Sequence, residues 1–352
     1  MDHITLPVAP ERPAGLVGIA RLAAASPKVR DRAEVEYFSL ESRSTLNHES
    51  SGHMPFDWTI NPYRGCEFGC KYCYARYTHE FMEIWDGKDF ERKIFAKVNS
   101  PDVLRAELRA AKDKGLAIAL GTATDPYQPA EKHFEITRRM LEVFAEFEAL
   151  EFSITTKSTL ILRDLDLLGV ISQRHRFGVH MTVTTTNERL ARLLEPKAPP
   201  PAKRLEAVAA LAQAGIYVGV NAMPILPGLN DDPAALEDLA RQAAEAGAKF
   251  IYGNVLFLMP SAMKQFMPFL EAEFPRLVKR YRGLYARSAY LNGEYKEQMM
   301  KLVAELRSSY GLAGNREELR LATRCHQFAL PFDEPPERAE SAGLVTPCNE
   351  AV

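Results

Sequence analysis

Three of the five cysteines lie within eight residues, in the stretch "GCEFGCKYCYAR" from Gly65 to Arg76. Cys66, Cys70 and Cys73 have the spacing C-x3-C-x2-C. Thiolates are soft ligands that suit zinc or iron–sulfur clusters, and this spacing lets one loop supply three ligands to a compact site. Cysteines that are merely buried have no physical reason to cluster in this way. The stretch therefore predicts a metal centre.

The fourth ligand separates the possible metal centres. Structural zinc takes four protein ligands, and the candidates for the fourth are His79 or the distant pair Cys325 and His326. Such a zinc site would belong to a module that binds protein or RNA. An electron-transfer iron–sulfur protein would normally supply four cysteines. A catalytic cluster instead leaves its fourth iron open, which fits three cysteines. Cys325 and Cys348 lack the spacing for a second cluster.

The composition predicts a well-packed cytoplasmic protein. The 352 residues are 46% hydrophobic and 26% charged, with a formal net charge of -2. Near neutrality gives no general attraction to polyanions, although residues 276–282 form a local basic face. No basic segment followed by an apolar stretch opens the chain, and no apolar run approaches the ~18 residues of a membrane span. Few and clustered cysteines argue against a secreted disulfide framework.

Short apolar segments alternate with helical patterns from Trp58 onward. The expected strands are "WTINPY", "LAIALGTA", "FSITTK", "FGVHMTVTT", "YVGVNAMPI" and "FIYGNVLFL", and "KIFAKVN" reads as an extra peripheral strand. The expected helices cover 101–114, 130–147, 160–168, 202–214 and 233–246, with Ser100 and Asp232 as N-caps and with Gly115, Gly215 and Gly247 at helix ends. This alternation predicts an α/β fold, a complete or partial (β/α) barrel of six units, with a doubly wound sheet as the rival.

The expected organisation has four parts. Residues 1–57 form an N-terminal extension with one strand-like patch, "VEYFSLES", and residues 58–275 form the barrel core. Residues 276–330 form a helical segment, and residues 331–352 form a disordered tail. The proline-rich stretch "EPKAPPPAKR" reads as a stiff loop. The cysteine segment and four other polar loops all follow strands, so we expect them to surround one mouth of the barrel.

The segment "CEFGCKYC" resembles the motif of the radical S-adenosylmethionine (SAM) family. The resemblance extends through "NPYRGC", "GTATDPYQPAEK", "SITTKS" and "NAMPILPGLND" to the branch that contains spore photoproduct lyase and DNA-photolyase-like proteins. It covers roughly residues 35 to 260 and implies a partial TIM-like barrel of six units. It also implies a 4Fe-4S cluster on the three cysteines, with SAM bound to the open iron.

The resemblance also implies roles for individual residues. Tyr72 matches an aromatic position near the adenine of SAM, while Lys157 and Thr182 match residues that meet its carboxylate. Asp125 is a candidate partner for the amino or ribose groups of SAM, or alternatively an Asp that opens the turn before Pro126. Each of the other three residues has a structural alternative. Tyr72 would be an aromatic side chain of the core, Lys157 a solvated lysine and Thr182 an ordinary strand residue.

The implied reaction begins with an electron from an external donor of the flavodoxin or ferredoxin type. The reduced cluster cleaves SAM, and the resulting 5'-deoxyadenosyl radical removes a hydrogen atom from a substrate, with nucleic acid as one candidate. Tyr72 and Tyr74 match two family tyrosines, so a radical relay through Tyr74 is possible. Thr122 stands where spore photoproduct lyase has a hydrogen-donating cysteine, which argues against that repair reaction.

Overall fold

The computed structural model describes residues 15–50, 54–111 and 116–314. Its main element is a sheet with the strand order β11-β10-β9-β8-β7-β4-β3. The strands are β3 Asn47–His48, β4 Trp58–Ile60, β7 Ala117–Leu120, β8 Glu151–Thr156, β9 Arg176–Thr182, β10 Val218–Ile225 and β11 Ile251–Val255. The six strands from β4 to β11 pair in parallel, and β3 is antiparallel to β4. This parallel sheet, curved and lined by helices, confirms the expected partial barrel.

The strand β8 illustrates how the residue pattern builds the sheet. Phe152 and Ile154 are buried in the main core, whereas the intervening Ser153 and Thr155 are only half-buried. Successive side chains of a strand point to opposite faces, so the apolar set packs against the outer helices. The polar set lies on the opposite, concave face of the sheet, which is the interior of the barrel.

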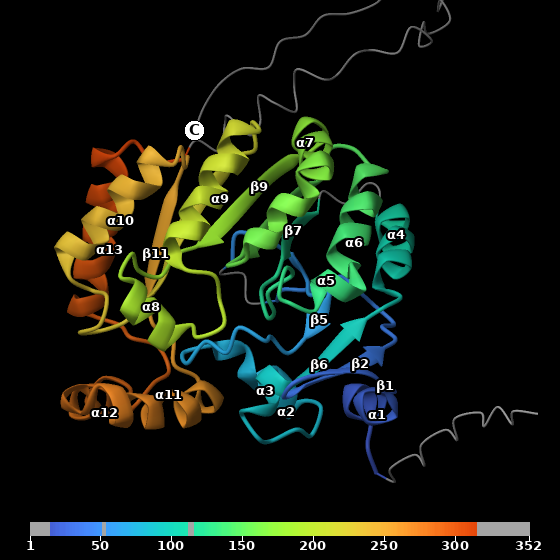
Figure 1. Cartoon of the computed structure of the whole chain (residues 1–352), viewed down its shortest axis with the longest axis horizontal. Coiled ribbons are helices and arrows are strands. Elements are labelled where there is room, and N and C mark those ends of the chain that lie inside the picture. Colours follow the sequence, from blue (N-terminus) through green and yellow to red (C-terminus); the bar gives the residue numbers. More distant parts are fainter. Residues whose placement is uncertain (1–14, 51–53, 112–115, 315–352) are drawn as a thin grey trace, which may run out of the picture.

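Helices cover the outer face of the sheet (Figure 1). They are α4 Ser100–Ala110, α6 Ile136–Ala145, α7 Leu165–Arg174, α9 Pro201–Gln213 and α10 Pro233–Glu245, with α13 Glu294–Ser309 packed against β11 and α10. Asp232 caps α10 as expected, because its carboxylate accepts a hydrogen bond from the Ala235 amide at 3.1 Å. Gly215 and Gly247 end their helices with φ of 76° and 81°. Gly115 lies outside the described residues.

Three helical predictions need correction. Asn99 precedes α4, and Ser100 is its first helical residue rather than its N-cap. The expected helix over 130–147 is divided into α5 Glu131–Phe134 and α6, because Glu135 between them has a φ of 49°, which no helix interior accommodates. The segment expected as helix over 160–168 starts with the 3-10 turn η2 Thr159–Asp164 before α7 continues.

A second, smaller sheet ties the N-terminal region to the cysteine segment. Its strands are β1 Lys28–Arg32, β2 Val35–Leu40, β5 Tyr63–Arg64 and β6 Lys93–Lys97, in the order β1-β2-β6-β5. The strands expected from "VEYFSLES" and "KIFAKVN" are therefore confirmed as β2 and β6, whereas "WTINPY" is divided between β4 and β5. The helix α1 Gly18–Ala25 precedes this sheet, and η1 Tyr74–Arg76, α2 Tyr77–Glu80 and α3 Asp89–Arg92 connect β5 to β6.

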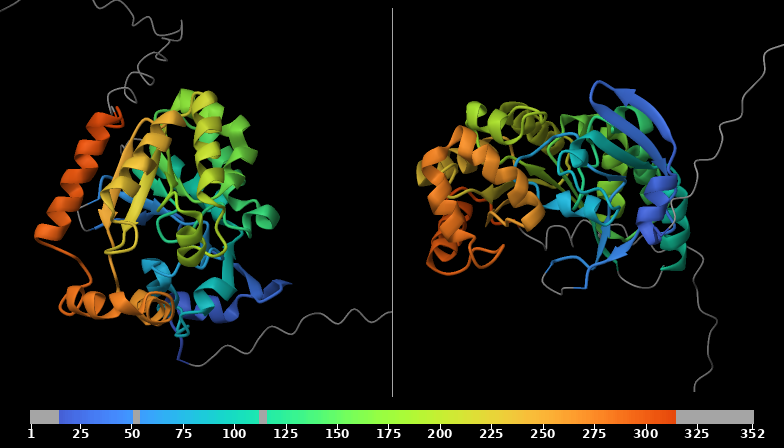
Figure 2. Two further views of the ribbon diagram at one scale, coloured as in Figure 1. Left: turned by 60° about the vertical axis from the view of Figure 1, so that its left-hand side comes forward. Right: turned by 90° about the horizontal axis from the view of Figure 1, so that it is seen from below.

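The remaining helices gather on the side toward which the parallel strands point. They are α8 Glu188–Leu194, α11 Pro260–Glu273, η3 Pro275–Leu277 and α12 Val278–Leu284. Figures 1 and 2 show α11 and α12 on the same side of the molecule as α2 and α3, and α11 packs against η1. The expected tail over 331–352, Cys325, His326 and Cys348 lie outside the described residues. Among the described helices, none is both long enough and apolar enough to cross a membrane.

Candidate active site

The three clustered cysteines have free thiols and lie between β5 and α2. Burial, followed by the effects of Asp125 and Cys70, raises the pKa of Cys66 well above its usual value. Burial also raises the pKa of Cys70 to about 12, although Lys157 acts in the opposite direction. Thiolates at this place therefore need a cationic partner, and metal binding supplies one as it releases the thiol protons. The three cysteines share one loop, although their thiols are not gathered around a single metal position in this structure. Three cysteine ligands would leave one iron of a cluster open.

Two glycines give the cysteine loop its shape. Gly65 has a φ of 83°, and a Cβ there would come within 2.8 Å of the Lys93 carbonyl oxygen. Gly69 has a φ of 66°, and its Cβ would come within 2.7 Å of Glu91 Oε2. Both positions combine a left-handed backbone with a close approach, which only glycine tolerates without strain. The loop is therefore packed tightly around the segment that leads into β6.

Buried polar side chains brace the same loop. Gln128 is fully buried, and its Oε1 accepts from the Glu67 amide at 3.0 Å while its Nε2 donates to the Gly65 carbonyl at 3.1 Å. Arg76 donates from Nη2 to the Cys70 carbonyl at 2.9 Å and forms an ion pair with Glu91. These contacts hold the backbone beside the first two cysteines in one conformation.

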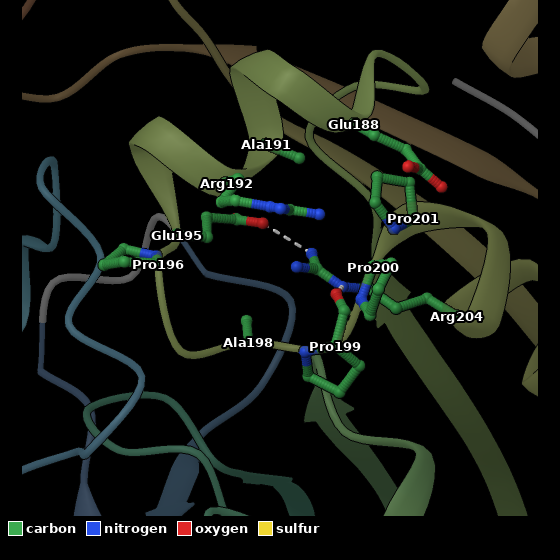
Figure 3. A pocket seen from close by; sticks show the side chains of 10 residues that line it. All are labelled: Glu188, Ala191, Arg192, Glu195, Pro196, Ala198, Pro199, Pro200, Pro201 and Arg204. Carbon is green, nitrogen blue, oxygen red and sulfur yellow. Dashed lines mark hydrogen bonds and ion pairs between the residues drawn. The ribbon is translucent and has the colours of Figure 1, made fainter.

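A buried polar cluster lies next to the last two cysteines. The Tyr72 hydroxyl donates to the Glu195 carboxylate and lies 3.1 Å from Thr184 Oγ1. Thr184 donates to Glu195 Oε1 at 2.7 Å, and Arg204 Nη1 contacts Glu195 Oε2 at 2.6 Å. Figure 3 shows the Glu195 and Arg204 side chains pointing toward one another. Lys157 completes the cluster, with Nζ 4.0 Å from Glu195 Oε1 and 5.9 Å from the centre of the Tyr72 ring.

The charges in this cluster are unequal, because one carboxylate serves two cations. Burial opposes ionisation of Glu195, but Arg204 and then Lys157 hold its pKa below the usual value. Burial likewise opposes the charge on Lys157, yet Cys70 and Glu195 raise its pKa. Within this cluster one carboxylate, Glu195, thus faces two cations, Lys157 and Arg204, while Asp125, outside the cluster, also acts on Lys157. Two cations in one buried group favour an anionic ligand beside the cysteines.

Sequence reasoning missed Glu195, Arg204 and Thr184. The first two were read as the ends of a stiff loop, but α9 already begins at Pro201, and both side chains are at most 2% exposed. Thr182, predicted to meet the SAM carboxylate, offers its backbone carbonyl to Arg204 Nη1 at 3.1 Å. It is the hydroxyl of Thr184 that reaches Tyr72. A glutamate and an arginine that flank a proline-rich turn were the available signal.

Asp125 lies at the base of Lys157. Its carboxylate accepts from the Lys157 amide and the Thr156 hydroxyl, each at 2.7 Å, and from the Tyr127 amide at 2.9 Å. The carboxylate thus closes the turn before Pro126 and joins it to the end of β8, as the turn alternative anticipated. Burial raises the pKa of Asp125 despite these donors.

His79 makes its contacts with residues of α3 and β6. Its Nε2 is 3.0 Å from the Lys93 carbonyl, and its ring packs against Phe90 at 5.2 Å and Phe95 at 6.0 Å. Burial lowers its pKa to about 4, so the ring is neutral. Within the described part of the chain, no group of three or more His, Cys, Asp or Glu side chains is arranged to hold a single metal ion.

Tyr74 opens an aromatic row at the mouth of the barrel. Its hydroxyl donates to the Thr122 carbonyl, and the Thr122 hydroxyl accepts from Asn61 Nδ2 at 3.1 Å. The Tyr74 ring is 38% exposed and lies 6.1 Å from the ring of Phe257, which stacks on Tyr290 at 4.3 Å. The structure therefore brings Tyr74 and Thr122 together beside the cysteines, with exposed aromatic surface leading outward.

Comparisons with known proteins agree with this geometry. The family model described as "Radical SAM superfamily" matches residues 60–254. An uncharacterized protein of Mycobacterium tuberculosis is 36% identical over 282 residues, which cover 80% of this chain and 83% of that protein. An uncharacterized protein of Methanocaldococcus jannaschii is 31% identical over 243 residues, covering 69% of this chain and 85% of that protein.

Solved structures share the fold. Spore photoproduct lyase complexed with dinucleoside spore photoproduct has a TM-score of 0.60 at 16% identity, covering 86% of this chain and 85% of that one. A double mutant of spore photoproduct lyase with bound AdoMet and the same dinucleoside has a TM-score of 0.56 at 15% identity, covering 87% and 85%. The likeness in fold thus extends over most of the chain, well beyond the cysteine segment.

Proposed function

Because this chain belongs to the radical SAM superfamily, we propose that Cys66, Cys70 and Cys73 bind a 4Fe-4S cluster at which SAM is reductively cleaved. Enzymes of this superfamily use a 4Fe-4S cluster and SAM, and this protein is an enzyme of that class. The observation that carries the proposal is the placement of three free cysteines in one loop, next to a buried group in which Glu195 faces both Lys157 and Arg204. When bound, the two cofactors supply a 5'-deoxyadenosyl radical that abstracts a hydrogen atom.

The side chains next to the cysteines are proposed to bind SAM. Lys157 pairs with the SAM carboxylate, Tyr72 packs near the adenine, and Asp125 and Thr182 complete the site. Glu195 and Arg204 act as positioning residues, because their ion pair fixes the Tyr72 hydroxyl and lies within 4.0 Å of the Lys157 ammonium. The two cations of this group support a carboxylate ligand rather than a cation.

A structural zinc site with His79 is the weaker reading. The Lys93 carbonyl contacts His79 Nε2, and two phenylalanine rings pack against the imidazole. Its buried Nδ1 has no hydrogen-bond partner, but no group of three candidate ligands in the described residues includes it. A zinc ligand would instead direct a ring nitrogen at the metal from ~2.1 Å. The contacts of His79 therefore support a role in packing β6 against α2.

The mouth supports a substrate with planar rings. The aromatic row of Tyr74, Phe257 and Tyr290 offers exposed faces on which nucleobases can stack, and spore photoproduct lyase has been solved with a dinucleoside ligand. We therefore keep nucleic acid as the candidate substrate. Thr122 is a poor hydrogen-atom donor, so a radical relay would involve Tyr74. We also propose that an external one-electron donor reduces the cluster and that the protein is cytoplasmic. The division of the chain into four parts likewise remains a proposal.

Lys157→Met tests the SAM site without relying on turnover. After anaerobic reconstitution with iron and sulfide, SAM is titrated into the dithionite-reduced protein while the electron paramagnetic resonance spectrum of the cluster is recorded. We expect the variant to retain its iron but to need at least about tenfold more SAM for the same spectral change, since a buried charge-assisted contact is lost. Lys249→Met, at an exposed lysine before β11, is the control. An unchanged titration, or zinc in place of iron, would contradict the proposal.

A further inference from the structure

A groove of about 450 Å³ lies between the cysteine loop, α3, α8 and α11. We call it the donor groove. The residues that line it include Lys71, Arg76, Glu91, Arg192, Pro196, Gln265, Phe269 and Glu273. Tyr72 points into the polar cluster while its neighbour Lys71 lines the donor groove, and Arg192 and Pro196 line both this groove and the smaller pocket beside Glu195 and Arg204.

The donor groove reaches the backbone of a proposed cluster ligand. Lys71 stands between Cys70 and Cys73 in the chain, and its amide donates to the Leu194 carbonyl at 2.9 Å. Arg76, which lines the groove, donates to the Cys70 carbonyl at 2.9 Å. A molecule seated in the groove is thus one side chain away from the cysteine loop.

The charge of the donor groove is positive where it is open to solvent. The Arg76 guanidinium is neutralised by Glu91, and both side chains are largely buried. Lys71 and Arg192 also line the groove, and the exposed Lys197 directly follows the lining residue Pro196 in the chain. Among the ion pairs of the described residues, none involves these three cations, whereas Glu273 is the remaining carboxylate of the lining. The open part of the groove therefore carries a net positive charge.

We propose that the donor groove docks the protein that reduces the cluster, an acidic one-electron donor with a flavin or an iron–sulfur centre. The inference rests on the proposed function, because only a redox cluster needs such a partner. One electron leaves the reduced donor, which is oxidised by one electron, and the cluster is reduced by one. Carboxylates of the donor meet Lys71, Arg192 and Lys197, and the apolar surface of Phe269 and Pro268 lies beside them. Complementary charge speeds such encounters and makes them depend on salt.

The test compares two reductants on one reconstituted holoenzyme. Reduced flavodoxin is the protein donor and dithionite is the small one, and stopped-flow absorbance follows reduction of the cluster by each. Arg192→Glu/Lys197→Glu reverses two groove charges, and Arg109→Glu/Lys249→Glu makes the same change at exposed positions on α4 and before β11. We expect the groove variant to slow reduction by flavodoxin at least tenfold at low salt, and to leave reduction by dithionite within twofold of wild type. The control variant should change neither rate by more than twofold.

A series of salt concentrations and a variant with neutral side chains complete the test. The wild-type rate with flavodoxin should fall as ionic strength rises, whereas Arg192→Gln/Lys197→Gln should show a weaker dependence on salt. Equal slowing by the control variant, or no slowing by the groove variant, would overturn the proposal. The proposal would also be overturned if the groove variant lost binding to a single-stranded oligonucleotide while flavodoxin still reduced its cluster at the wild-type rate. The groove would then bind nucleic acid. Failure of dithionite to yield 5'-deoxyadenosine in the wild type would instead contradict the proposed function.

Discussion

At the scale of single residues, the site depends on a carboxylate that no motif identifies. The spacing of the cysteines was enough to predict a metal centre, because three thiols in one loop have few other uses. Glu195 and Arg204 gave no such signal, because charged residues beside prolines are usually exposed. Their burial, at 2% and 1% exposure, follows from tertiary packing of α8 and α9 around Tyr72. Pairwise contacts of this kind cannot be read from one sequence.

The buried pair leads to a prediction about stability. Glu195→Gln leaves the Arg204 guanidinium buried without its counter-charge, so the free energy of unfolding should fall by about 3–5 kcal/mol. In Glu195→Gln/Arg204→Met no buried arginine is left unpaired, so most of that loss should be recovered. Urea unfolding of the metal-free wild type, of Glu195→Gln, of Arg204→Met and of the double variant, followed by circular dichroism, measures these values. If the double variant is as unstable as the sum of the two single variants, the two residues do not act as a pair.

At the scale of elements, the parallel strands were predictable and the joints between elements were not. Runs of β-branched and apolar residues identified the six strands, since both faces of a parallel strand are covered. The break between α5 and α6 was missed because Glu135 carries no sequence mark of its left-handed backbone. A histidine forms another such connection between elements. His175, 2% exposed, accepts from the Leu150 amide at Nδ1 (3.2 Å), and its Nε2 lies 3.1 Å from the Phe144 carbonyl.

This connection should make stability depend on pH. The two backbone contacts require a neutral ring, and burial lowers the pKa of His175 to about 4, whereas the unfolded residue has a pKa of about 6.5. The unfolded state therefore binds the proton first, and the stabilisation is lost as the pH falls from about 6.5 toward about 4. Between pH 7 and pH 5, His175 should account for about 2 kcal/mol of the loss in unfolding free energy.

His175→Gln isolates this contribution. The variant should be less stable than wild type at pH 7, because it loses the paired backbone contacts, yet its unfolding free energy should depend less on pH. Urea unfolding at pH 7 and at pH 5 gives the comparison. Equal pH dependence in the two proteins would mean that His175 is protonated in the folded state over this range.

At the scale of the whole molecule, one side of the barrel carries every part of the proposed chemistry. The cysteine loop, the ends of β8 and β9, and α8 meet there, while α11 and α12 cover the adjoining surface (Figure 2). The barrel was predictable from the alternation of strands and helices. The pairing of β2 with β6, which ties the N-terminal region to the cysteine segment, was not, because pairing partners far apart in the chain leave no local pattern.

The central claim is that Cys66, Cys70 and Cys73 hold a cluster that cleaves SAM. The most direct measurement is anaerobic: the protein is reconstituted with iron and sulfide, dithionite and SAM are added, and 5'-deoxyadenosine is quantified by chromatography. We predict product from the wild type and from Cys325→Ala, and loss of both iron and product when any one of the three cysteines is replaced by Ala. Product that survives one of these three replacements, or a wild type that holds one zinc and forms none, would contradict the claim.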